Sequence, residues 1–193
     1  MIRRALRWLS RVATNMRHDR VNATQLSPEQ AAEIAACAAR RTEALANPAL
    51  SPLQRLVHWW GDDATSGATG ADVDALEARY GIRVPGDFRA YLIATMPKGN
   101  EWDSEGTNWW PLADLKSARD ECAGWEGGTG LQDDDKVIVF ADYLIWCFAW
   151  AIDCSEGINR GKVIVLTGTT NPRVAENFDD FLDRYVRDPS SVM

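Results

Sequence analysis

Histidines and cysteines, the side chains that most often bind metals or act as nucleophiles, are few in this chain and lie far apart. They are His18, His58, Cys37, Cys122, Cys147 and Cys154. No two cysteines have the C-x-x-C spacing of a zinc site, and neither histidine accompanies a Cys or Ser in the sequence context of a catalytic nucleophile. The residues therefore predict a protein that is not an enzyme, with no cofactor and no metal.

One acidic stretch has the residue types that a hard cation needs. Asp133-Asp134-Asp135, followed by Asp142, would supply carboxylate oxygens of the kind that Ca²⁺ prefers. The spacing of an EF-hand loop is absent, so a solvated acidic turn is the favoured interpretation. The preceding Gly127-Gly128-Thr129-Gly130 lacks the lysine and the helix of a phosphate-binding loop, and residues 124–135 are expected to form a mobile, acidic loop.

The chain is also rich in tryptophan, with nine of these residues. Trp102, Trp109, Trp110 and Trp125 lie in or beside acidic segments. Aromatic side chains surrounded by charge are typical of the anchoring residues of a protein-binding surface. Covering a small sheet is the alternative role for two or more of them, because tryptophan serves cores and surfaces equally well.

The net charge of −7 conceals an asymmetry along the chain. Residues 1–60 carry nine Lys and Arg against four Asp and Glu, and residues 61–193 carry twelve against twenty-four. An acidic body repels nucleic-acid phosphates, so no nucleic acid is expected as a partner. Its field would instead attract a basic protein.

Cys147 lies inside a run of apolar and aromatic residues, so we expect it to be a buried free thiol. A Cys147–Cys154 disulfide is the alternative. Free thiols are typical of a reducing compartment, which predicts a cytoplasmic protein. No apolar run approaches the ~20 residues that span a bilayer, and the Arg-rich start lacks the apolar core of a secretory signal.

Two helical segments are expected in residues 1–50, which we interpret as a helical N-terminal extension. Residues 2–17 alternate apolar and Arg positions at helical spacing. Packing on the chain's own acidic domain is the favoured role, and contact with an anionic membrane surface or an acidic partner is the alternative. Ser27-Pro28 starts a second helix, which Asn47-Pro48 ends.

Residues 51–193 have the pattern of an α+β domain, a small, mostly antiparallel sheet wrapped by helices. Helices are expected from Ser51-Pro52, before Gly81, after Val84-Pro85 and over residues 178–186. Strands are expected over residues 137–140, 143–152 and 162–166, the second as a central strand covered on both faces. Glu77 lies beside an apolar helix face, so we expect it to be partly buried and bonded to backbone or to an Arg.

A series of short motifs recurs in a characteristic order. The matching residues are Leu76, Glu77, Gly81, Val84, Pro85, Asp87, Phe88, Pro111, Leu112, Phe148–Asp153, Gly161–Val165 and Ala175–Leu182. In this order the chain resembles the SUKH superfamily over residues 52–188. That group includes yeast Smi/Knr-type cell-wall regulators and many bacterial toxin-immunity proteins. The resemblance implies a SUKH-like α+β fold and a protein that works by binding.

We therefore expect a bacterial immunity protein that neutralises a cognate, basic toxin by steric occlusion. The expected contact residues are Trp102, Asp103, Glu105, Trp109, Trp125, Glu126, Asp133, Asp134 and Asp135. The alternative is a regulatory or scaffold protein that binds endogenous partners through its N-terminal helices. A hydrolase or metal-dependent enzyme is the least favoured class.

Overall fold

The computed structural model describes residues 27–61, 64–97, 103–168 and 170–193. The chain forms two compact units, Met1–Ala36 and Cys37–Met193. The predicted amphipathic helix over residues 2–17 lies outside the described residues. The predicted boundary between extension and domain, at residues 50 and 51, stays a prediction, and the second compact unit begins earlier in the chain.

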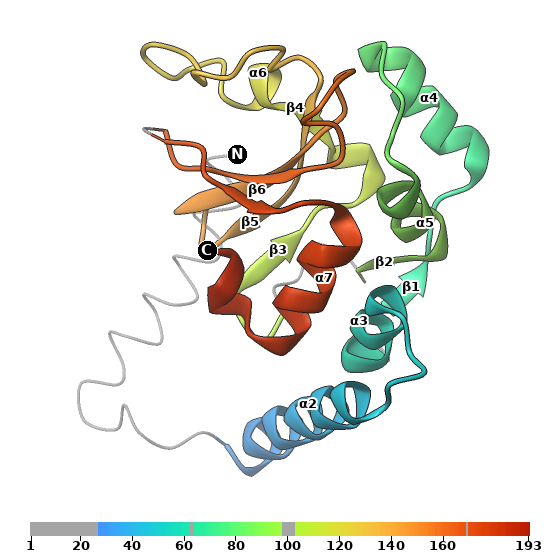
Figure 1. Ribbon diagram of the computed structural model, residues 1–193. Coiled ribbons are helices and arrows are strands. Elements are labelled where there is room, and N and C mark those ends of the chain that lie inside the picture. Colours follow the sequence, from blue (N-terminus) through green and yellow to red (C-terminus); the bar gives the residue numbers. More distant parts are fainter. Residues whose placement is uncertain (1–26, 62–63, 98–102, 169) are drawn as a thin grey trace. The chain divides into compact units, whose positions relative to one another are not determined.

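Helices predominate in the first half of the described chain, and four consecutive strands followed by a helix form most of the second half (Figure 1). The helices are α2 (Pro28–Ala46), α3 (Pro52–Trp60), α4 (Gly70–Tyr80), α5 (Gly86–Ala94), η2 (Leu112–Asp114), α6 (Ala118–Glu121), α7 (Phe178–Arg187) and η3 (Pro189–Val192). The strands are β1 (Ala64–Ser66), β2 (Thr95–Pro97), β3 (Thr107–Trp109), β4 (Lys116–Ser117), β5 (Val137–Tyr143), β6 (Phe148–Asp153), β7 (Val163–Leu166) and β8 (Arg173–Ala175).

The main sheet is antiparallel, with strand order β3-β5-β6-β7-β8. The short β4 pairs with the same edge of β5 as β3 does, nearer the start of β5. In Figure 1, α7 lies on one side of this sheet, and α6 with the loop that follows it lies on the other. The fold class is therefore α+β, as the sequence predicts.

Local signals in the sequence set the ends of the helices. Ser51 and Gln54 form a capping box at the start of α3, and Thr69 and Asp72 form another at the start of α4. In each, the side chains satisfy backbone N–H groups that the first turn leaves without a partner. Gly81 ends α4 in the left-handed conformation, at φ 61°.

The strand pattern differs from the prediction at its centre. The expected strand over residues 143–152 is wrong, because a four-residue turn, Leu144–Cys147, separates Tyr143, the last residue of β5, from β6. The run is continuous because the end of β5, the turn and β6 up to residue 152 all consist of apolar and aromatic residues. Cys147 consequently lies in the turn, exposed, and the expectation of a buried thiol is wrong. All four cysteines are free.

An aromatic core fills the space between the sheet and the helices. Phe140 of β5 lies 5.3 Å, between ring centroids, from both Phe178 and Phe181 of α7. Phe88 of α5 lies 4.8 Å from Phe178. All four side chains are at most 1 % exposed. Burying such rings stabilises the fold by about 1.5–3 kcal/mol each, and the ring contacts fix how α5 and α7 meet the sheet.

Two acidic residues of the motif order these helices. Glu77 accepts a hydrogen bond from the backbone N–H of Val84 at 2.9 Å and lies 3.5 Å from Arg89, which confirms the role expected for it. Asp87 accepts hydrogen bonds from the backbone N–H groups of Phe178 and Asp179, at 2.7 and 3.2 Å. A side chain at the start of α5 therefore caps α7, some ninety residues later in the chain.

The second half of α2 is part of the compact unit through Arg41. Its guanidinium donates to the backbone oxygens of Val186 and Arg187, the carbonyls that end α7. It also lies 4.9 Å above the ring of Trp59 in α3. Cations stabilise the carbonyl end of a helix. Arg41 therefore fastens the second half of α2 to α3 and α7.

Candidate functional site

Three loops meet at one end of the main sheet, around Trp125. They are the loop 122–136 between α6 and β5, the turn Leu144–Cys147, and the loop 167–172 between β7 and β8. The indole rings of Trp125 and Trp146 meet edge to face, with centroids 5.5 Å apart. Trp125 also packs against Gly168, where an added Cβ would lie 3.7 Å from the ring. Trp125 thus joins segments that lie far apart in the sequence.

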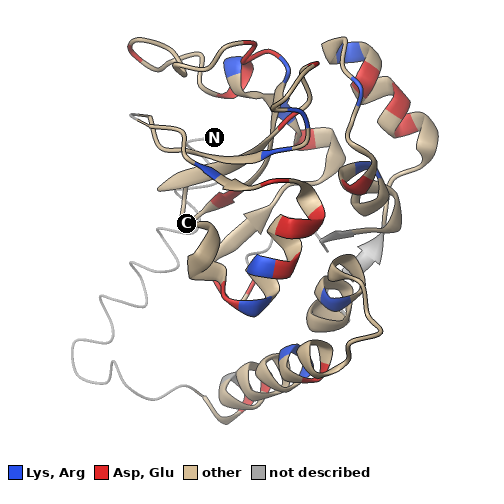
Figure 2. Cartoon of the chain, in the orientation of Figure 1, with Lys and Arg blue, Asp and Glu red and all other residues tan. Residues whose placement is uncertain are grey.

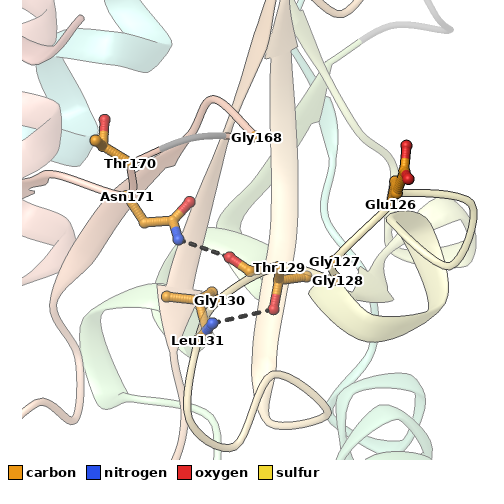
Figure 3. A pocket seen from close by; sticks show the side chains of 9 residues that line it. All are labelled: Glu126, Gly127, Gly128, Thr129, Gly130, Leu131, Gly168, Thr170 and Asn171. Carbon is orange, nitrogen blue, oxygen red and sulfur yellow. Dashed lines mark hydrogen bonds between the residues drawn. The ribbon is translucent and has the colours of Figure 1, made fainter.

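A hollow of about 510 Å³ opens between two of these loops (Figure 3). It is lined by Glu126, Gly127, Gly128, Thr129, Gly130, Leu131, Gly168, Thr170 and Asn171. The Asn171 amide donates to the backbone oxygen of Thr129 at 2.8 Å, and the backbone N–H of Leu131 donates to the Thr129 hydroxyl. The lining side chains carry no cation, so the hollow does not suit a phosphate group, which agrees with the absence of a phosphate-loop sequence.

The acidic run 133–135 is partly occupied by contacts within the protein. Asp134 accepts hydrogen bonds from Arg119 at 2.8 Å and from the Thr129 hydroxyl at 2.9 Å. Asp135 lies 3.3 Å from the same guanidinium. The hydrogen bond from Asp134 raises the pKa of Arg119. Two of the three carboxylates therefore fasten the loop, and Asp133, exposed at φ 53°, is left facing solvent.

Asp142 does not join this run. It lies in β5, 5 % exposed, and its carboxylate accepts hydrogen bonds from the side chains of Asn108 and Trp110 and from the backbone of Trp146. These donors occupy the oxygens that a cation would need. Within the described ranges, no group of three His, Cys, Asp or Glu side chains is placed to hold a metal ion.

Asp103 and Trp109 belong to an internal network, whereas both were expected on a contact surface. Asp103 accepts hydrogen bonds from the indole of Trp109, the hydroxyl of Tyr185 and the backbone N–H groups of Glu105 and Thr107. Burial raises the pKa of the Asp103 carboxyl. Trp109 is 1 % exposed, so it is a core residue and the prediction that it contacts a partner is wrong.

The remaining expected contact residues lie on the surface loops or outside the described part of the chain. Glu105 is paired with Arg41 at 3.1 Å, and its side chain is 33 % exposed. Glu126 is exposed beside Trp125 at the edge of the hollow. Trp102 lies outside the described residues. The structure therefore places Trp125 and Glu126 where the loops meet. The acidic run lies just before the start of β5, at the opposite end of that strand from the turn Leu144–Cys147.

The turn Leu144–Cys147 was missed by the sequence analysis and has the most unusual backbone in the domain. Leu144, Ile145 and Trp146 have φ values of 41°, 57° and 68°. The left-handed region costs about 1–2 kcal/mol for each residue that is not glycine, and it is rare for a β-branched side chain. Leu144 and Ile145 are also 42 % and 38 % exposed. The sequence gives one sign of this turn: the apolar run over residues 143–152 is longer than an ordinary strand.

Surrounding contacts hold this turn in place. The backbone N–H of Leu144 donates to the Gly106 oxygen at 3.1 Å, and Gly106 leaves room for the Leu144 side chain, which would lie 2.9 Å from an added Cβ. The Trp146 indole donates to Glu121 at 3.1 Å, and its backbone N–H donates to Asp142. Fixed on both sides, the turn presents Leu144 and Ile145 to solvent.

The charge of the compact unit is strongly negative. Residues 37–193 carry fifteen Lys and Arg against twenty-five Asp and Glu, a net charge of −10. Figure 2 shows the acidic residues spread over helices and loops, with basic residues among them. In the part of the chain that the structure describes, no helix is both long and apolar enough to cross a membrane.

The comparison with known families agrees with the geometry. The model of the SMI1 / KNR4 family (SUKH-1) matches residues 67–184, more than half of the chain. This range runs from the loop before α4 to α7, and it includes Glu77 and Asp87. No protein of curated function matches the chain. With the motifs and the fold both in place, the chain belongs to the SMI1 / KNR4 family (SUKH-1).

Proposed function

We propose that the protein is an immunity protein that binds a cognate bacterial toxin and blocks it sterically, without catalysis. Membership of the SMI1 / KNR4 family, which is known in toxin immunity and is generally non-catalytic, is the observation that carries this proposal. The acidic charge of the compact unit supports it, because a field of this sign speeds the approach of a basic partner and repels nucleic acids.

The proposed contact surface is the end of the sheet where the three loops meet. Glu126 is exposed there, Asp133 is exposed in the same loop just before the start of β5, and both remain in the set of contact residues. Asp134 and Asp135 contribute charge, but their first role is to hold the loop through Arg119. Asp103 contributes indirectly, because its four hydrogen bonds fix the loop that carries Glu105.

The test is a capture experiment with the tagged, full-length protein and lysate of the source cells. The expected result is one stoichiometric protein with a toxin domain, whose toxicity is suppressed when the two are co-expressed. A Glu126→Lys/Asp133→Lys variant should weaken binding by about tenfold, because it puts like charge against a basic surface. Ile158→Asn, in the turn between β6 and β7, serves as the matched control for a general loss of folding.

A different result would point to the regulatory alternative. Capture of endogenous housekeeping proteins alone, abolished when Arg3, Arg4, Arg7 and Arg11 are changed to Gln, would contradict the immunity proposal. In that case binding would depend on the N-terminal segment.

A further inference from the structure

We propose that Leu144 and Ile145 are the apolar anchor by which the protein docks into an apolar pocket of a basic protein partner. This inference rests on the proposed function and assigns it a contact site that the acidic loops alone do not supply. The two side chains are neighbours in sequence and are both more than one-third exposed. Together they form a small exposed apolar patch, whose area a partner can remove from water.

The turn is rigid, which suits an anchor. Four contacts fix it: Leu144 N–H to Gly106, Trp146 N–H to Asp142, the Trp146 indole to Glu121, and Cys147 N–H to the Tyr143 oxygen at 2.8 Å. The Trp146 ring is further held against Trp125. Binding through a group that is already ordered loses little conformational entropy, so more of the contact energy appears as affinity.

Leu, Ile and Trp are not the residues that would stabilise this turn best. Hairpin turns with left-handed residues usually contain Asn or Gly, which adopt these φ values readily. Here Leu, Ile and Trp occupy consecutive left-handed positions. Strain of this kind persists where the surrounding structure enforces it, and it is concentrated at functional sites. An Asn-Gly turn would adopt this backbone without strain, but it would present no apolar side chains to a partner.

Charge distinguishes between two partners that could cover the turn, a second copy of the chain and a different, basic protein. A second copy of the chain would bring together two units of net charge −10, which repel each other. Beside the turn, Glu126 next to Trp125 adds an exposed carboxylate, whereas Glu105 next to Gly106 is already paired with Arg41. A basic protein whose apolar pocket is rimmed by Lys and Arg complements both features.

The experiment compares three full-length proteins against the purified basic protein that the wild type captures. The test variant, Leu144→Asn/Ile145→Gly, removes both apolar side chains and supplies residues that favour the left-handed backbone. Ile158→Asn is the matched control, because Ile158 is 88 % exposed in the turn between β6 and β7, at the other end of the sheet. Calorimetric titration measures Kd, and thermal unfolding measures Tm.

We expect the double variant to raise Kd by at least about tenfold while its Tm stays equal or rises, because strain is relieved as contact area is lost. The control should bind within about twofold of the wild type. If the double variant changes Tm but not Kd, the turn has a purely structural role. That result would overturn the anchor proposal and leave the proposed immunity function unaffected. If the wild type captures no basic protein, the proposed function fails first and this inference fails with it.

Cys147 gives a second measurement that needs no variant. It is exposed in the turn, whereas Cys122 and Cys154 are each 2 % exposed. Bound partner should slow alkylation of Cys147 by N-ethylmaleimide at least about fivefold, because contact area at such an anchor is closed to water. Unchanged alkylation in the complex would overturn the proposal. Dimerisation of the wild type that the double variant abolishes would also overturn it, by assigning the turn to a second copy.

Discussion

A single carboxylate, Asp87, fixes the position of the last helix of the domain. It accepts hydrogen bonds from the backbone N–H groups of Phe178 and Asp179, while Asn177 caps the same turn from within the chain by accepting from the N–H of Asp180 at 2.8 Å. Burial, and then the nearby Asp87 charge, raises the pKa of the Asp179 carboxyl. The motif residue thus positions α7, whose apolar side fills the core.

Replacing Asp87 should therefore weaken the whole domain. We expect Asp87→Ala to lower the free energy of unfolding by about 2 kcal/mol, because two backbone donors lose a charged acceptor. Asp87→Asn should recover part of the loss. Urea denaturation measures both, with Asp74→Ala as control, since Asp74 is 65 % exposed and its pair with Arg89 contributes little. A loss no larger than that of the control would contradict the capping role.

At the scale of elements, α3 and α7 are joined by an ion pair at the edge of the core. Arg55 of α3 is 9 % exposed and donates to Asp183 of α7 at 2.6 Å. Asp183 also accepts from Arg187, one turn later on the same helix. The hydrogen bond from Arg187, followed by the charges of Arg187 and Arg55, lowers the pKa of the Asp183 carboxyl.

This pair gives the fold a predictable pH dependence. Because the folded pKa is lowered, the stabilisation from Asp183 is complete above the ordinary pKa of about 4 and is lost as the pH falls through the lowered value. Asp183→Asn should cost about 1 kcal/mol at pH 7, a modest figure because Asp183 is 33 % exposed and water screens the pair. The difference from wild type should shrink steadily as the pH falls below about 4, as followed by urea denaturation at several pH values. A constant difference across that range would show that the charge is not responsible.

At the scale of the whole molecule, charge and shape contribute to binding in different ways. The net charge of −10 on residues 37–193 acts over several ångströms and favours encounter with a basic partner. The strained turn at Leu144 and Ile145 acts only on contact. Under the proposed function, the first determines how quickly the complex forms and the second how long it lasts.

Salt should separate these two contributions. Raising NaCl from about 50 mM to about 500 mM should lower the association rate constant with the captured partner by about tenfold, because exposed charges are then screened within a few ångströms. The dissociation rate constant should change by less than about threefold. Surface plasmon resonance measures both rates. An association rate independent of salt would contradict electrostatic attraction as the source of recognition.

Much of the fold could be predicted from the sequence because its signals are local. Ser51, Thr69 and Gly81 set helix ends through hydrogen bonds and dihedral angles within a few residues of themselves. The candidate site was predicted less well. Trp125 and Glu126 lie where the loops meet, but Trp109 is in the core, because a tryptophan in an acidic segment has the same sequence pattern whether its indole meets solvent or a buried carboxylate.

The sequence by itself determined the fold class, the main helices, the acidic character and the family, since each depends on residue type and short-range spacing. Only the tertiary structure decided which side chains meet. The cap of Asp87 on α7, the hold of Arg119 on the acidic loop and the strained turn at Leu144 all join segments distant in sequence. Such contacts follow from how the sheet and helices pack, and no local pattern along the chain specifies them.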